Sequence, residues 1–193
     1  MADRRIEILE ATCKVIGRSG IHDLRVEDVA KEVGVSPALV YYYFDTRADL
    51  LARAFEFADN RSTAHTRKQM DLEASGRRQI EDILFHEFDE APDVHDNWVI
   101  WSEMGAAAVF DKDLLGSVEK WSEHWVKIVA DLIRAGHKDG SISRDVVPND
   151  AGERLTAVVD GLGTKLMLGI MSQDRVRKLV RDAIETELGP PPG

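Results

Sequence analysis

The chain has 193 residues, 44% of them hydrophobic, and a single cysteine, Cys13, so it can bury a core but cannot form an internal disulfide or a cysteine-rich metal site. It shows neither a signal peptide nor a run of about 20 apolar residues, so we expect a cytoplasmic protein with no membrane partner. The net charge is −10, and even residues 1–60 carry 8 basic against 11 acidic residues, which excludes a generally basic nucleic-acid binder.

Apolar residues recur with the 3.6-residue period of an amphipathic helix along most of the chain, and no strand pattern competes with them. We therefore predict an all-α fold of about nine helices. The predicted helices are 4–19, 26–33, 36–44, 47–70, 76–91, 97–110, 112–135, 149–171 and 173–188. Glycines and prolines, among them Gly20, Pro92, Gly136 and Pro148, mark the expected ends.

The second and third predicted helices have the spacing of a helix-turn-helix. Gly34 ends the earlier helix, Ser36 can cap the next one, and Pro37 suits a first helical position. In this motif the later helix enters the DNA major groove and its N-terminal residues face the base edges. The sequence therefore predicts a recognition helix over residues 36–44.

Three consecutive tyrosines on this helix either cover a small core or face DNA. Val40 and Phe44 continue the buried stripe, and successive helical side chains point about 100° apart, so a core cannot take all three rings. A phenol can donate to a phosphate oxygen, and its ring can pack on a sugar or on a thymine methyl group. We therefore expect Tyr41, Tyr42 and Tyr43 to contact DNA.

The stretch from Val26 to Leu51 resembles the DNA-binding domain of the TetR/AcrR repressor family. The motifs that carry the resemblance are Val29-Ala30, Gly34-Val35-Ser36, Val40-Tyr41-Tyr42-Tyr43-Phe44 and Arg47-Ala48-Asp49-Leu50-Leu51. The resemblance implies a repressor released from a pseudo-palindromic operator by a small-molecule effector, with no enzymatic activity, cofactor or metal. It implies a three-helix DNA-binding domain over residues 1–46 and a helical-bundle domain for effector binding and dimerisation over 47–188. We expect the tail, 189–193, to be disordered.

By the same resemblance, Pro37, Ala38, Leu39 and Tyr42 face bases, whereas Tyr41, Tyr43 and Arg47 hold phosphates. The full set of predicted DNA-binding residues is Arg25, Glu27, Ser36, Pro37, Ala38, Leu39, Tyr41, Tyr42, Tyr43 and Arg47. Two of these depart from the family pattern. Arg25 replaces the usual Ser or Thr helix cap, and Glu27 either accepts a hydrogen bond from cytosine N4 or repels phosphate.

Aromatic side chains are concentrated between residues 76 and 138, where they form either a plain bundle core or a lined cavity. Stretches 97–110 and 135–168 resemble the BetI-type C-terminal region, which favours an effector cavity. The predicted effector-binding residues are Phe85, Phe88, Asp89, Trp98, Trp101, Met104, Trp121 and Trp125. Nearby polar side chains, His86, Glu87, Asp89, Glu90, Glu103 and His124, either bind a polar or cationic effector or form a solvated face.

The last two predicted helices are apolar enough to leave an exposed patch on a monomer, so we predict a homodimer through a two-fold four-helix interface. The predicted interface residues are Leu155, Val158, Val159, Leu162, Leu166, Val176, Leu179 and Val180. Effector binding would then change the spacing of the two recognition helices.

An enzyme and a helical adaptor are the two alternative classes for an all-α chain of this kind. A di-iron enzyme needs paired Glu-x-x-His motifs on facing helices, and the sequence contains none, nor a phosphate-binding glycine loop or a Cys-x-x-Cys motif. A helical adaptor that binds only proteins or membrane surfaces would not protect DNA in a footprinting experiment, whereas a repressor would.

Overall fold

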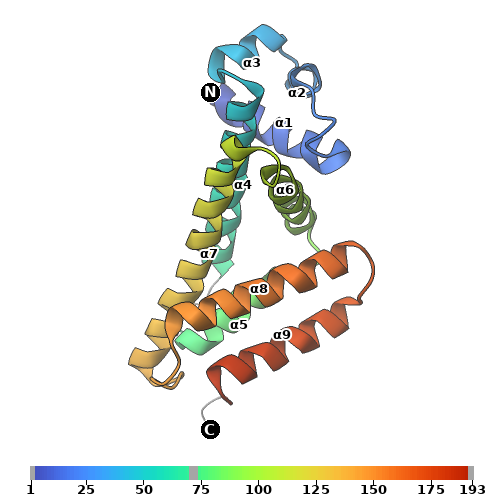
Figure 1. Cartoon of the computed structure of the whole chain (residues 1–193). Coiled ribbons are helices and arrows are strands. Elements are labelled where there is room, and N and C mark those ends of the chain that lie inside the picture. Colours follow the sequence, from blue (N-terminus) through green and yellow to red (C-terminus); the bar gives the residue numbers. More distant parts are fainter. Residues whose placement is uncertain (1–2, 70–73, 191–193) are drawn as a thin grey trace. The chain divides into compact units, whose positions relative to one another are not determined.

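The computed structural model describes residues 3–69 and 74–190, and over these ranges its secondary structure consists of nine helices and no strand (Figure 1). The prediction of an all-α fold is therefore confirmed. The helices are α1 (Arg4–Ser19), α2 (Val26–Val33), α3 (Pro37–Tyr43), α4 (Arg47–Gln69), α5 (Gly76–His86), α6 (Pro92–Ala108), α7 (Lys112–Asp139), α8 (Pro148–Met167) and α9 (Gln173–Leu188). None of the described helices is long and apolar enough to cross a membrane.

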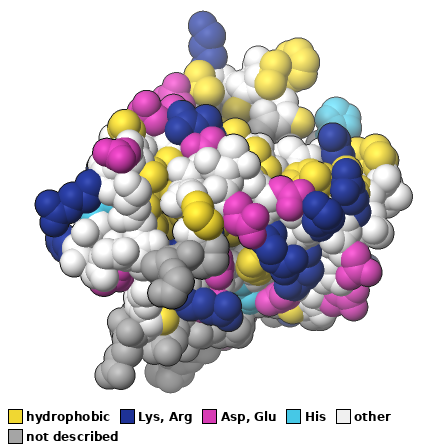
Figure 2. Space-filling model, turned by 90° about the horizontal axis from the view of Figure 1, so that it is seen from below, with side chains coloured by type: hydrophobic (Ala, Val, Ile, Leu, Met, Phe, Trp, Pro, Cys, Tyr) yellow, Lys and Arg dark blue, Asp and Glu magenta, His cyan; other side chains and the backbone are white. Residues whose placement is uncertain are grey.

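The chain divides into two compact units. The first comprises Met1–Ala64 and His95–Lys120, and the second comprises His65–Val94 and Trp121–Gly193. Parts of α4, α6 and α7 belong to each unit. On the face seen in Figure 2, basic and acidic side chains are intermingled with hydrophobic ones, as the mixed composition of the helices leads one to expect.

In the first unit, α2 packs against both α1 and α3. The side chains of Ile8, Ile16, Val29, Val40 and Phe44 are almost fully buried among these helices, and the first two turns of α4 add further buried apolar residues. This burial removes apolar surface from water and holds the three short helices together.

The one cysteine belongs to the same core. Burial raises the pKa of the Cys13 thiol to about 11, so the thiol stays protonated at neutral pH. Its role is therefore packing rather than thiol chemistry.

Local capping residues set the helix ends between residues 33 and 50, and Gly34 and Ser36 act as predicted. Gly34 has a left-handed backbone (φ +77°) that ends α2. The Ser36 side chain accepts a hydrogen bond from the Leu39 N–H at 3.3 Å, and the Thr46 hydroxyl accepts one from the Asp49 N–H at 3.0 Å. These caps fix the short turn before α3 and the start of α4.

Several later boundaries differ from the prediction. Helix α5 ends at His86 rather than at residue 91, and α6 begins at Pro92 rather than at residue 97. Proline breaks a helix when it lies inside one but is well suited to a first turn, so Pro92 starts α6 instead of ending the segment before it.

Helix α7 runs past Gly136 to Asp139 because this glycine serves helix packing. A Cβ atom built on Gly76 of α5 would lie 2.3 Å from the Gly136 backbone nitrogen, and one on Gly136 would lie 2.5 Å from a methyl carbon of Ile142. The two glycines therefore permit a close crossing of α5 and α7. The helix ends instead at Gly140, whose φ is +79°.

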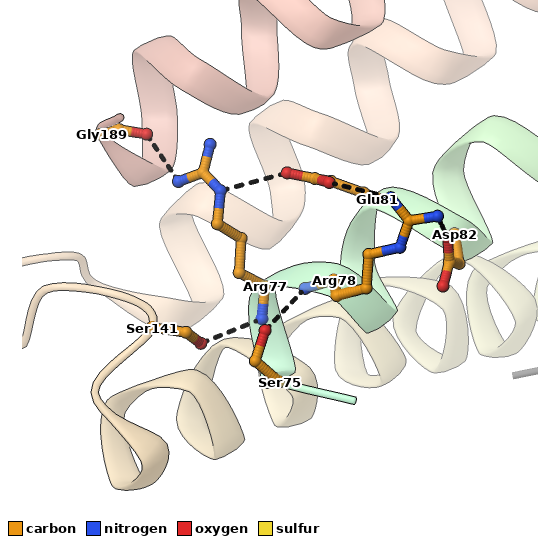
Figure 3. Close-up of polar contacts among 7 residues, drawn as sticks. All are labelled: Ser75, Arg77, Arg78, Glu81, Asp82, Ser141 and Gly189. Carbon is orange, nitrogen blue, oxygen red and sulfur yellow. Dashed lines mark hydrogen bonds and ion pairs between the residues drawn. The ribbon is translucent and has the colours of Figure 1, made fainter. Parts of the chain in front are cut away.

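In the second unit, α8 and α9 pack side by side, and α5 also packs against α9 (Figure 1). A buried arginine connects α5 to the C-terminal end of α9 within this unit. Arg77, 4% exposed, donates from Nη1 to the Gly189 carbonyl at 2.6 Å and from Nε to the Glu81 carboxylate at 3.1 Å (Figure 3). Gly189, which we assigned to a disordered tail, is therefore held in place, and residues 191–193 lie outside the described residues.

Candidate DNA interface and effector region

The recognition helix presents two tyrosines outward. Val40 and Phe44 are each 1% exposed, whereas Tyr41 is 48% and Tyr42 79% exposed. The half-buried Tyr43 ring lies edge-on to Tyr42, with 5.2 Å between ring centroids and an interplanar angle of 89°. The inward face predicted for Val40 and Phe44 is confirmed, and the outward tyrosines leave a surface with both aromatic and hydroxyl character.

The remaining predicted DNA contacts surround this surface. Arg25, Glu27, Ser36 and Ala38 are exposed, whereas Pro37 and Leu39 are half-buried. Arg25 precedes α2 and makes no side-chain cap for it. Contact of these residues with DNA stays a prediction.

Arg47 does not point freely toward solvent. Its Nε donates to the Leu24 carbonyl at 3.1 Å, and its Nη2 donates to the Ile21 carbonyl. A hydrogen bond from Arg47 to a DNA phosphate, as predicted, would therefore compete with these two hydrogen bonds within the chain. In this structure the guanidinium binds the loop between α1 and α2.

Glu103 also contacts this loop. Its carboxylate accepts a hydrogen bond from the Ile21 backbone N–H at 2.8 Å. The two residues are 82 positions apart, and nothing in the local sequence around Glu103 signals such a partner.

The aromatic residues predicted to bind an effector fall in both units. In the first unit, Met104 is fully buried, Trp98 is half-buried, and the Trp101 ring lies edge-on to Phe55 with 3.9 Å between centroids. The Trp101–Phe55 contact lies within the first unit. In the second unit, Trp121 and Trp125 lie half-buried on α7.

Three more of the predicted effector residues are engaged by neighbours at the end of α5. Arg177 and Arg181 lie over the Phe85 ring, 5.9 and 5.5 Å from its centroid. The Asp89 carboxylate accepts from Arg177 at 2.6 Å and lies 2.8 Å from the His86 ring nitrogen, and Phe88 is buried. Asp89 is thus already paired with Arg177 of the same chain, which weakens its case as an effector ligand.

A pair of carboxyl groups in the second unit is electrostatically unusual. The pKa of Glu87 is raised to about 7. Burial is the largest cause, and the nearby negative charges of Asp160 and Asp89 add to it. Burial also raises the pKa of Asp160 to about 6. Sequence reasoning named Glu87 but missed Asp160, because only the fold brings α8 close to the end of α5.

Models of two known families match this chain. The model described as bacterial regulatory proteins of the tetR family matches residues 8–54, and that of the BetI-type transcriptional repressor C-terminal region matches residues 76–189. The chain belongs to the TetR family of bacterial regulators. It is therefore a DNA-binding transcriptional regulator, and α1–α3 contain the helix-turn-helix of this TetR-family protein.

Individual relatives agree with this assignment. The transcriptional regulator PksA of Bacillus subtilis is 24% identical over 186 residues, which cover 95% of this chain and 89% of PksA. A putative TetR-family regulator from Rhodococcus sp. has a structure with a TM-score of 0.90, 32% identity and coverage of 97% and 100% of the two chains. A putative regulator from Saccharomonospora viridis, solved in complex with choline, has a TM-score of 0.83, 26% identity and coverage of 96% and 97%.

In this TetR-family chain, the residues predicted for the dimer interface divide into two groups. Five are buried in the chain's own fold: Leu155, Val159, Leu162, Val176 and Val180. Three keep exposed surface: Val158, Leu166 and Leu179. Leu168 and Ile170, at the turn between α8 and α9, are 63% and 70% exposed. The exposed apolar surface of α8, α9 and the turn between them therefore includes the second group and this turn.

Proposed function

We propose that this TetR-family regulator is a homodimeric repressor that reads a pseudo-palindromic operator through α3. In this proposal residues 1–46 bind DNA, and residues 47–188 bind the effector and dimerise. The observation that carries the proposal is the outward face of α3, on which Tyr42 is 79% exposed while Val40 and Phe44 lie in the core. An aromatic, uncharged reading surface is suited to sugar, methyl and phosphate contacts, so DNA shape contributes much of the specificity.

Dimerisation in this proposal uses the apolar surface that remains exposed on α8 and α9. Two copies related by a two-fold axis would cover Val158, Leu166 and Leu179 of each chain and hold the two recognition helices about one DNA turn apart. Sedimentation velocity of the protein alone tests this part. A dimer is expected, and replacing Leu166 and Leu179 with glutamate should give a monomer that binds the operator weakly.

We further propose that the effector is a small organic cation. The half-buried carboxyl groups of Glu87 and Asp160 become negative when they ionise, and the half-buried Trp121 and Trp125 of the same unit provide the aromatic faces that favour such cations. The similar Saccharomonospora viridis regulator, solved with choline, supports this class of ligand. Cation binding favours the ionised carboxyl groups, so affinity should rise as the pH increases from 5.5 to 8.

Selection of bound DNA from a random library tests the DNA-binding proposal and supplies the operator. Isothermal titration with choline, and with acetate as an anionic control, tests the effector proposal. Choline should bind to the protein and cause it to release the selected DNA. The Glu87→Gln variant should lose the part of the pH dependence of choline binding that Glu87 causes, whereas Asp160 should still contribute near pH 6. Binding of the anion alone would contradict the cationic effector, while leaving the DNA-binding proposal intact.

A further inference from the structure

The loop between α1 and α2, residues 20–24, is held by two helices that lie far from it in sequence. The Ile21 N–H donates to the Glu103 carboxylate of α6 at 2.8 Å. The Ile21 carbonyl accepts from Arg47 at the start of α4, and the same guanidinium donates to the Leu24 carbonyl at 3.1 Å. Both polar groups of Ile21 are thus bound, each by a different helix.

The backbone of this loop leaves room for the Glu103 carboxylate, because residue 20 is a glycine. Gly20 has a φ of +73°, and a Cβ atom at this position would lie 2.8 Å from the Glu103 Oε2 atom. A side chain here would therefore push Glu103 away. The neighbouring Ile21 and Leu24 side chains are 5% and 3% exposed, so the loop is also held by its apolar residues.

The loop leads directly into the helix-turn-helix. Arg25 follows it and α2 begins at Val26, which packs into the core with 4% exposure. A change in the position of residues 20–24 must therefore move the start of α2, because buried side chains on both sides prevent the loop from absorbing the change.

We propose that Glu103 and Arg47 are positioning residues for DNA recognition: together they fasten the loop before α2 to α6 and α4, and so set the placement of the recognition helix. The inference rests on the DNA-binding part of the proposed function. A hydrogen bond of 2.8 Å to a charged acceptor is strong but short-ranged, so a shift of α6 by about 1 Å is enough to break it. Glu103 is thereby a point at which a movement of α6 reaches the loop before α2.

The first test measures the loop itself in the full-length protein. Amide hydrogen exchange at Ile21 should become at least about tenfold faster in the Glu103→Ala variant, since a charge-assisted hydrogen bond is lost. Glu103→Gln keeps a carbonyl acceptor and should restore part of the protection. Glu119→Ala is the matched control, because Glu119 is an exposed glutamate on α7 with no described hydrogen bond or ion pair. Exchange at Ile21 that is unchanged in Glu103→Ala would overturn the proposal.

The second test measures affinity for the DNA selected by the wild-type protein. Glu103→Ala and Arg47→Ala should each weaken binding by about tenfold, and Glu103→Gln by less. Both residues hold the same loop. The double variant should therefore lose little more DNA affinity than whichever single variant binds DNA less tightly. For Arg47→Ala the salt dependence should keep its wild-type slope, whereas loss of a phosphate contact would reduce that slope by about one unit.

The outcomes separate the two proposals. If the wild-type protein selects no DNA sequence, the proposed function fails, and the exchange measurement still tests the loop contacts. If it selects DNA but Glu103→Ala binds within twofold of wild type, or the losses in the double variant multiply, the positioning role is wrong while the DNA-binding function stands.

Discussion

Replacing Arg77 with alanine should destabilise the second unit strongly. Arg77 is buried, and its guanidinium donates to the Gly189 carbonyl at 2.6 Å and to Glu81 at 3.1 Å (Figure 3). Each hydrogen bond to a charged group contributes about 1.5–3 kcal/mol, and removal of one partner leaves the other without compensation. After allowance for the recovered cost of burying the guanidinium, we expect a loss of about 3–5 kcal/mol in the free energy of unfolding.

Urea unfolding followed by circular dichroism measures this loss, and the neighbouring arginine supplies the control. Arg78 has the same side chain on the same helix, but its side chain is 64% exposed and its ion pair with Asp82, at 2.9 Å, lies at the surface. Arg78→Ala should therefore cost less than about 1 kcal/mol. Equal losses for the two variants would show that burial and the bond to Gly189 do not determine the stability of this unit.

Three further predictions follow from particular contacts. Gly76→Ala should destabilise the protein by about 1–3 kcal/mol in a thermal unfolding assay, because the new Cβ would lie 2.3 Å from the Gly136 nitrogen. Gly116 has open space around it, so Gly116→Ala should be neutral or stabilising in that assay. Because burial raises the folded-state pKa of Glu87 to about 7, the native state binds extra protons, so the free energy of unfolding should fall by on the order of 2–3 kcal/mol between pH 4 and 7. Glu87→Gln should flatten that decline in urea titrations at several pH values. Tyr42→Ala should weaken binding to the selected DNA by about 1–3 kcal/mol and broaden the sequences recovered in a repeated selection; an unchanged sequence preference would remove Tyr42 from the base-reading surface.

The N-terminal helices were predictable because their determinants are local. Gly34 and Ser36 act on the backbone within a few residues of themselves, and the 3.6-residue period places Val40 and Phe44 on one face. Such signals do not depend on the rest of the fold. The helix-turn-helix and its buried stripe were therefore read correctly from the sequence.

The features that sequence reasoning missed depend on distant partners. Gly136 looks like a helix end, but it lies inside α7 because α5 crosses there. Glu103 looks like one acid among several near the aromatic residues, yet its partner is the backbone of Ile21. Asp160 acquires its raised pKa only from burial in the folded unit. Periodicity and capping carry no information about such contacts.

The dimer prediction shows the same limit in another form. An apolar helical residue faces either its own chain or a partner, and the hydrophobic pattern is identical in both cases. Val159 and Val176 turned out to be buried in the chain's own fold, whereas Val158 keeps exposed surface. Only side-chain burial in the structure separates the two groups.

The most direct test of the account is the DNA selected from a random library by the full-length protein. We expect a pseudo-palindromic sequence whose half-sites are about one helical turn apart, or a multiple of it, with preference lost at specific base pairs in the Tyr42→Ala variant. Recovery of no enriched sequence, or of single sites without two-fold symmetry, would contradict a dimeric repressor that reads DNA through α3.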